Sequence, residues 1–463
     1  MNRLIKNIDW IVTVDGRRRM IADGAIAIRG DRIEAVGKSA ELERNFAAYD
    51  VVNGRGLIAI PGMIDTNVAT VQQLGRGAAD FCDIPQFMLQ RTLAYEAALS
   101  PEDALAASRA CHLEMIRSGT TCFVDSGSRH PDAVAEVAIE SGLRATVARA
   151  CYDQFDTFMG AFPASFARES AGEAVSRAAA CADYVRRMGC DRIRPALALP
   201  WLAASSDELC RQVADLARTD ALPVIAAAVR SRDDAVASRR QHSCTEIKRL
   251  QSAGLLMPTS IIAHAGWTSP EDLADIKASN ATVACCPSAA FRLGTGAMEF
   301  GRYPELLAFG VNVTLGSGSA MGSNYIDIAR QLYLFAGASK SFRLDATIVP
   351  PETALEMVTI RAASALGLAS EIGSLEAGKK ADITFFNMIA ADWAPVINPI
   401  ANLVFSCRGG AHTVIVDGRD LMTAGRVCSI DEDRVLHESQ LRAEAIAQRS
   451  GLDRFCTSRW AVS

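Results

Sequence analysis

Eight short apolar segments recur through the middle of the chain, with helical stretches between them. The segments begin near Leu57, Thr121, Ala145, Ile193, Pro223, Ser260, Thr282 and Val311. Alternation of buried strands with helices is typical of βα units on a parallel sheet. Eight units over about 300 residues match the size of a (β/α)8 barrel with insertions. The predicted fold class is therefore α/β, with a TIM barrel at its centre.

The two ends of the chain carry a different pattern. Short strand-like runs break at Asp15-Gly16 and Gly30-Asp31, and similar runs return at 381–386 and before Asp417-Gly418. Such spacing is typical of antiparallel strands joined by turns. We therefore expect a composite β-sandwich built from both ends of the chain. The expected divisions are 1–60 for its first part, 61–368 for the barrel, 369–430 for its second part and 431–463 for a helical tail.

Composition narrows the class of protein. The chain has 463 residues, 49% of them hydrophobic, and a net charge of −5. These values exclude a disordered chain and predict no nucleic-acid partner, since phosphate binding needs a basic surface. No stretch approaches the roughly 18 apolar residues of a membrane helix, and charges interrupt the N-terminal segment, so neither a membrane span nor a signal peptide is expected. Thirteen cysteines without a CxxC motif indicate reduced thiols and a cytoplasmic location.

Several longer motifs carry a family resemblance. They are Ser118-Gly-Thr-Thr, Ile261-Ile-Ala-His-Ala, Val414-Ile-Val-Asp-Gly, the runs 364–368 and 372–382, and Pro61-Gly-Met-Ile-Asp-Thr-Asn-Val-Ala-Thr. With these motifs the chain resembles the amidohydrolase superfamily, in the branch of cytosine deaminase, guanine deaminase and triazine chlorohydrolase. The resemblance covers nearly the whole chain. It implies the same barrel and composite β domain, and an assembly of two or more copies.

The resemblance also implies a metal site that this sequence does not preserve. Members of the family hold one divalent metal with a His-x-His after strand one, a His after strand five and an Asp after strand eight. The matching positions here are Asn67, Ala69, Ala227 and Gly318. Alanine and glycine have no side-chain lone pair, and a catalytic zinc usually takes three protein ligands. We therefore expect no metal and no other cofactor.

Three residues are the catalytic candidates. His264 matches a histidine that assists the metal-bound hydroxide in the family, and Arg230 stands at the position of the acid/base glutamate. Cys285 ends strand seven and is a possible nucleophile if His264 lies within reach. Because side chains alternate along a strand, only one of Cys285 and Cys286 can face the site. Rim salt bridges for the arginine and inert buried thiols are the alternatives.

Five further residues are candidates for substrate binding. Gln72 resembles a substrate-contacting position of the family, and Asn67 could donate a hydrogen bond to a carbonyl. Trp201 and Trp267 follow strands four and six and could form an aromatic wall. Arg292 could add a second positive charge, which suits an anionic substrate, or make a salt bridge at the rim.

The expected function is that of a metal-independent enzyme on the amidohydrolase scaffold. Its partner would be a small polar molecule, anionic or heterocyclic, and its reaction the hydrolysis of a C–N bond or ring. Two alternatives are a non-hydrolytic isomerisation or elimination, and an inactive binding subunit that pairs with an active relative. A third is a new metal site made of Cys285, His264 and Asn67.

Overall fold

The computed structural model describes residues 2–455 except 79, 81 and 409. Its centre is a sheet of eight parallel strands in sequential order, which confirms the predicted barrel. The strands are β6 (Met63–Val68), β7 (Thr120–Asp125), β8 (Arg144–Ala150), β11 (Ile193–Leu199), β12 (Val224–Ala228), β13 (Ser260–His264), β14 (Thr282–Cys285) and β15 (Val313–Leu315).

The first and last strands close the ring. Val68 of β6 forms a parallel bridge with Gly318, and the Thr66 hydroxyl donates to the Leu315 carbonyl at 2.8 Å. The prediction that the first barrel strand begins near Leu57 is wrong, because the first barrel strand is the next one along the chain. Residues Leu57–Pro61 form β5 of the other sheet, and the barrel begins after Gly62. Both strands are almost wholly buried, but β6 carries Asp65, Thr66 and Asn67, so the more apolar run Leu57–Pro61 is the stronger strand signal in the sequence.

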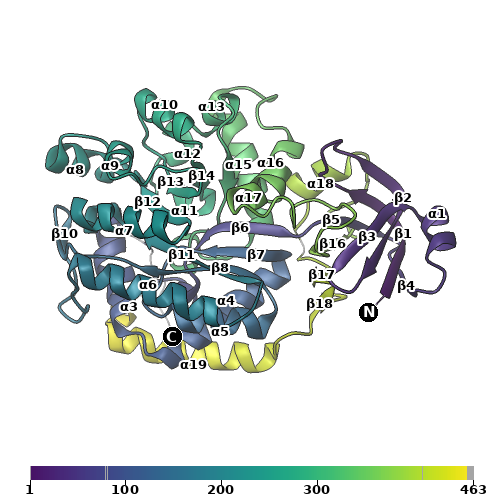
Figure 1. Ribbon diagram of the computed structural model, residues 1–463, viewed down its shortest axis with the longest axis horizontal. Coiled ribbons are helices and arrows are strands. Elements are labelled where there is room, and N and C mark those ends of the chain that lie inside the picture. The colour runs from purple at the N-terminus through teal and green to yellow at the C-terminus, as the bar shows by residue number, and fades with distance from the viewer. Residues whose placement is uncertain (1, 79, 81, 409, 456–463) are drawn as a thin grey trace, which may run out of the picture.

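Helices surround the barrel (Figure 1). Several begin with a Ser or Thr cap at the residue that follows a strand loop, as at Ser100, Ser170, Ser231 and Ser269. The helices of this layer are α4 (Pro101–Ser118), α5 (Pro131–Ser141), α6 (Ala171–Arg187), α7 (Asp207–Thr219), α8 (Arg232–His242), α9 (Glu246–Ser252), α10 (Pro270–Ser279), α11 (Pro287–Arg292), α12 (Ala297–Phe300), α13 (Tyr303–Ala308), α14 (Ala320–Ser323), α15 (Ile328–Arg343), α16 (Pro351–Met357) and α17 (Ile360–Ala365).

Two loop excursions carry structure of their own. The loop after β6 contains η1 (Thr70–Gly75), α2 (Ile84–Gln86), η2 (Phe87–Thr92) and α3 (Leu93–Ala98). The loop after β8 contains a small hairpin of β9 (Asp156–Thr157) and β10 (Gly160–Ala161), and η3 (Leu202–Ala204) follows β11. Aromatic side chains from the β8 loop pack together behind the barrel mouth: Tyr152, Phe155, Phe162 and Phe166.

A second sheet joins the two ends of the chain, as the sequence predicted. Strand β5 pairs with β1 on one side and antiparallel with β16 on the other, so that Pro61 faces Ile383. Figure 1 shows purple N-terminal and yellow-green C-terminal strands side by side in this domain. Its elements are β1 (Asn2–Val12), β2 (Met20–Arg29), β3 (Arg32–Lys38), α1 (Ser39–Asn45), β4 (Asp50–Asn53), β16 (Ile383–Asn387), α18 (Pro399–Phe405), β17 (Thr413–Val416), β18 (Arg419–Thr423) and β19 (Arg426–Val427).

The chain continues into α19 (Glu432–Ser450) and the short η4 (Asp453–Phe455). Helix α19 lies against α4, and Arg442 and Arg449 both bind the buried carboxylate of Asp103 there. It also packs on α3 and η1, two of the four elements of the β6 loop. Across the described residues, no helix combines the length and apolarity needed to cross a membrane.

Candidate functional site

A cavity lies where the carboxyl ends of the barrel strands meet, the face on which barrels of this kind carry active sites. About 870 Å³ around it is not filled by protein atoms, a volume that includes space open to solvent. Of the described residues that line it, Glu96 is the one carboxylate, Arg230 the one cation and His264 the one imidazole. The uncharged polar residues in the lining are Asn67, Gln72, Thr92, Ser126, Tyr152, Cys286, Thr295, Tyr303 and Ser319.

All four positions that the resemblance assigns to metal ligands line this cavity. Ala69, Ala227 and Gly318 offer no donor atom, and the Asn67 amide nitrogen donates to the Cys286 sulfur at 3.3 Å. Throughout the described ranges, no three His, Cys, Asp or Glu side chains gather closely enough to hold a metal ion. The residues present therefore do not fit the metal that the family holds.

The backbone at the strand-eight position is suited to glycine. Gly318 has a φ of +77°, and its N–H donates to the Asn67 carbonyl at 2.9 Å. Its own carbonyl accepts from the Ala69 N–H at 2.7 Å. A Cβ on residue 318 would lie 3.3 Å from the Ser323 hydroxyl and 3.4 Å from the Ala289 Cβ. The position that the resemblance assigns to the family's aspartate is thus a left-handed link between β6 and the loop after β15.

His264 ends β13 in an unusual backbone conformation. His264 and Ala265 have φ values of +72° and +51°, and the His264 carbonyl accepts from the Tyr303 hydroxyl at 2.6 Å. Non-glycine residues seldom adopt such angles, and strain of this kind concentrates at functional sites. Burial and the charge of Arg230 lower the pKa of His264 well below its usual value. The imidazole is therefore neutral at physiological pH and able to accept a proton.

Arg230 follows β12 and is held at two of its nitrogens. One nitrogen donates to the Met88 sulfur at 2.8 Å and another to the Pro200 carbonyl at 3.1 Å. A guanidinium carries five N–H groups, so others remain for a ligand. No salt bridge to this side chain is found among the described residues, in contrast to the expected alternative of a rim salt bridge.

Glu96 is a cavity residue that the sequence analysis missed. Its carboxylate accepts from the Gln72 side-chain nitrogen at 2.8 Å, and both side chains are buried. Burial raises the pKa of Glu96 to about 7, and Asp125 adds to the rise, while Gln72 and Arg129 oppose it. The sequence does contain a signal, since Glu96 is the one charged residue of the apolar helix α3.

Of the two neighbouring cysteines, Cys286 is the one that lines the cavity. Cys285 lies behind the wall, where its sulfur is 3.8 Å from the Met298 sulfur, and it does not line the cavity. The catalytic assignment of Cys285 therefore has no geometric support. Burial raises the pKa of the Cys286 thiol to about 12, so this side chain stays protonated at neutral pH and is a weak nucleophile.

Three of the predicted substrate-binding residues lie outside the cavity lining. The Trp201 indole is buried, donates to Asp234 at 3.3 Å and stacks on Phe162. The Trp267 indole donates to the Thr295 carbonyl at 2.8 Å. Arg292 pairs with Asp80 at 2.9 Å and donates to two carbonyls of α14. All three residues follow barrel strands as predicted, but their side chains bond to neighbouring loops and helices and do not line the cavity.

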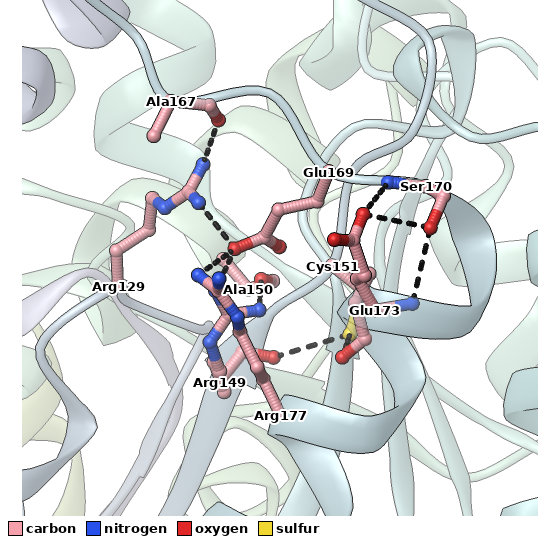
Figure 2. A network of polar contacts seen from close by, with 10 residues as sticks. Arg129, Arg149, Ala150, Cys151, Ala167, Glu169, Ser170, Glu173 and Arg177 are labelled. Atoms are coloured by element: carbon pink, nitrogen blue, oxygen red, sulfur yellow. Dashed lines mark hydrogen bonds and ion pairs between the residues drawn. The ribbon is translucent and has the colours of Figure 1, made fainter.

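A cluster of arginines stands behind the wall that carries Tyr152. Figure 2 shows the guanidinium groups of Arg129, Arg149 and Arg177 converging on one oxygen of Glu169, at 2.5, 2.5 and 2.6 Å. Arg129 also donates to the Ala167 carbonyl at 2.8 Å. The cluster joins the loops after β7 and β8 to α6. The positive charge of one member, Arg129, acts to lower the pKa of Glu96.

Comparisons with known proteins cover nearly the whole chain. Residues 58–421 match the model of the amidohydrolase family, and residues 24–48 match a bacterial imidazolonepropionase-like composite domain. A 5-methylthioadenosine/S-adenosylhomocysteine deaminase from Moorella thermoacetica is 32% identical over 94% of this chain and 97% of its own length. A 5'-deoxyadenosine deaminase from Methanosarcina mazei is 27% identical over 96% of this chain and 98% of its own.

Solved structures share the fold. An adenosine deaminase from Xanthomonas campestris with bound zinc superposes with a TM-score of 0.87, at 23% identity over 96% of this chain and 99% of its own. A zinc-containing atrazine chlorohydrolase from Arthrobacter aurescens gives 0.86, at 22% identity over 95% of this chain and all of its own.

Proposed function

Because this chain belongs to the amidohydrolase family, we propose that it hydrolyses a C–N bond of a small nucleoside-like heterocycle without the family's metal. The relatives' names, which are those of deaminases acting on adenosine derivatives, support the reaction and the substrate class. One observation carries the proposal. The cavity combines a neutral imidazole, a cation and a carboxyl group, whereas its four ligand positions hold three residues without donors and one amide.

His264 is the proposed base. A neutral imidazole can take a proton from water as the oxygen attacks the ring carbon. Its low pKa makes it a weak base but keeps it uncharged over the whole physiological range. The hydrogen bond that the Tyr303 hydroxyl donates to the His264 carbonyl fixes the backbone at this residue.

Arg230 is the proposed stabiliser of negative charge. Attack of water on a heterocycle places a negative charge on the ring, and a fixed cation in a desolvated site stabilises it. The same guanidinium would attract an anionic substrate, as the sequence suggested. Its contacts with Met88 and Pro200 limit the rotation of the side chain.

Glu96 is the proposed acid. With a pKa of about 7, part of the Glu96 population is protonated at neutral pH and can give its proton to the leaving nitrogen. The overall reaction consumes one water and releases ammonia from an amino-substituted ring, and the proton taken by His264 then returns to Glu96 through solvent.

The test is a release-of-ammonia assay on chelator-treated protein with measured metal content. The panel contains 5'-deoxyadenosine, 5-methylthioadenosine, S-adenosylhomocysteine and anionic heterocycles. We expect turnover with less than about a tenth of an equivalent of metal, and its loss in H264A and R230A. Stoichiometric metal that is required for turnover would overturn metal independence.

Two other outcomes identify the alternative functions. Binding of a panel compound without any product favours the inactive binding subunit, and co-purification of an active relative would support it. Conversion of a compound without release of ammonia and without gain of water favours isomerisation or elimination.

A further inference from the structure

The turn that presents Arg230 is held in a conformation that its sequence disfavours. Val229 follows β12 with a φ of +48°, an outlier for a β-branched residue. Its carbonyl accepts from the N–H groups of Gly266 and Trp267, at 3.0 and 3.2 Å. Its own N–H donates to the carboxyl group of Glu246. Arg230 is the next residue, so the direction of its side chain depends on this turn.

Glu246 comes from a different element and lies outside the cavity. It is the first residue of α9 and is 2% exposed. Three charged groups face it: Asp234 of α8, Arg249 of its own helix, and Arg230. A carboxyl group buried this deeply costs stability unless it has a partner, and the partner identified here is the backbone of the Arg230 turn.

A purely structural role for Glu246 in α9 is already filled by other residues. The cap of this helix is Thr245, whose hydroxyl accepts from the Lys248 N–H at 3.1 Å. Arg249 pairs with Asp207 at 3.0 Å and donates to the Leu202 and Ser205 carbonyls. Thr245 therefore caps the helix without Glu246, and the hydrogen bonds of Arg249 go to groups other than the Glu246 carboxyl group.

We propose that Glu246 is a positioning residue: its carboxyl group fixes the left-handed turn at Val229 and thereby holds the Arg230 guanidinium in the cavity. The proposal rests on the proposed function only where Arg230 is taken to act on a substrate. The orientation of Arg230 itself is independent of any reaction.

Ionisation of Glu246 makes the positive potential that Arg230 creates in the cavity depend on pH. Burial, together with the neighbouring Asp234, raises the pKa of Glu246 to about 8, although Arg249 and Arg230 act in the opposite direction. Below that pH the group is neutral and serves as a hydrogen-bond acceptor. Above it, a negative charge stands behind Arg230 and reduces the positive potential that reaches the cavity.

The experiment compares Glu246→Leu with Glu246→Gln. The leucine removes the acceptor, and we expect turnover to fall on the order of 100-fold, the usual effect of a displaced catalytic group. The glutamine keeps an uncharged acceptor. It should restore most of the neutral-pH rate and remove the part of the alkaline decline that falls near pH 8, while the decline near pH 7 that Glu96 sets should remain.

Thr245→Ala is the matched control, because it weakens the same helix and leaves the Val229–Glu246 contact in place. It should lower Tm without changing the pH profile. A pH profile of Glu246→Gln identical to that of the wild type would overturn the proposed titration. An equal loss of turnover in Thr245→Ala and Glu246→Leu would overturn the positioning role.

Crystal structures of the wild type and Glu246→Leu separate this inference from the proposed function. We expect the variant to move Val229 out of the left-handed region and to break the contacts of Arg230 with Met88 and Pro200. An unchanged Arg230 refutes the positioning role, whether or not the protein is an enzyme. A displaced Arg230 in a protein without turnover supports the positioning role and refutes the proposed function.

Discussion

At the scale of single residues, the Glu96–Gln72 pair gives the cavity a group that titrates near neutral pH. The Gln72 amide stabilises the charged carboxylate, whereas burial favours the protonated form. Both residues come from the loop after β6 rather than from a strand. The acid–base behaviour of the site is therefore set by the loop after β6 and not by the barrel strands.

We expect turnover to fall as the pH rises through about 7, because Glu96 then loses the proton that the leaving nitrogen needs. Glu96→Gln should reduce kcat by about 100-fold or more and remove this limb of the profile. Gln72→Leu should move the limb to higher pH, since it deletes the hydrogen bond that favours the charged form. The measurement is kcat against pH for the three proteins. A limb that Gln72→Leu shifts to lower pH contradicts the assignment.

A second prediction concerns Gly318. An aspartate here has to adopt a φ of +77° and to fit a Cβ 3.3 Å from the Ser323 hydroxyl. A side chain in the left-handed region costs about 1–2 kcal/mol. Gly318→Asp should therefore lower the free energy of unfolding, measured in urea, by at least that amount and should not restore metal binding.

Gly318→Ala is the control for the backbone cost, because it adds the Cβ without the carboxylate. A Gly318→Asp protein as stable as the wild type, or one that takes up stoichiometric zinc, would show that this part of the site has not been rebuilt around glycine.

The sequence predicted the positions of site residues better than their directions. His264, Arg230, Asn67 and Gln72 line the cavity, because a motif fixes both the strand end and the face. Cys285 and Cys286 differ by one residue, and only the strand register decides which side chain enters. A hydrogen bond decides the orientation of a tryptophan at a strand end, and its acceptor lies far away in the sequence.

At the scale of elements, the loop after β8 is anchored by the carboxylate of Glu169. Three arginines from the β7 loop, β8 and α6 meet on one oxygen of this group (Figure 2). Removing a buried partner leaves uncompensated charges, which is far more costly than losing an exposed ion pair. The loop carries Tyr152 into the cavity wall, so its anchor affects the shape of the site.

Glu169→Gln should lower the free energy of unfolding by about 3 kcal/mol or more and make the 151–170 segment sensitive to proteases. Glu173→Gln is the matched control, since this nearby carboxylate caps α6 and is exposed. Its loss should cost far less stability than the loss of Glu169, because Glu173 is exposed to solvent. Equal losses in urea unfolding of the two variants would contradict the anchoring role of Glu169.

The sequence also predicted the barrel strands correctly except for the first one. Apolar runs identify seven of the eight barrel strands, but Leu57–Pro61 and the more polar Met63–Val68 are two adjacent strands separated by a single glycine. Only pairing with β16 assigns the first of them to the second sheet. A partner more than 300 residues away leaves no mark in a local pattern.

At the scale of the whole molecule, the buried ionisable groups predict how stability depends on pH. The carboxyl groups of Asp65 and Asp125 have pKa values raised to about 6, Glu96 to about 7 and Glu246 to about 8. A raised pKa of an acid stabilises the fold at low pH and is lost as the pH rises through the folded value. Their contribution to stability should therefore decline from about pH 4, the pKa of a carboxyl group in the unfolded chain, to about pH 8.

Buried histidines act in the opposite direction. Burial lowers the pKa of His112 to about 3 and that of His264 well below its usual value. Their contribution is present above about pH 6.5, where an exposed histidine is neutral, and is lost as the pH falls towards the folded values. The two effects oppose each other between about pH 4 and pH 6.5, and above about pH 6.5 only the carboxyl groups act, so the unfolding free energy should decline there.

Urea unfolding of the wild type and of the double variant E96Q/E246Q across pH 4–9 checks this. The double variant should lose much of the decline at higher pH and keep the decline at low pH. An unchanged alkaline slope would mean that these two carboxyl groups do not titrate in the folded protein as their burial requires.

The pairing of Pro61 with Ile383 also constrains the order of events during synthesis. A ribosome makes the chain from its N-terminus at about 5–20 residues per second, so β5 waits tens of seconds for its neighbour β16. During that interval one edge of β5 has no strand to pair with, and such edges invite aggregation. The barrel can close before the second sheet is complete, because its last strand ends at Leu315. Completion of the second sheet therefore has to wait until all eight barrel strands have been made.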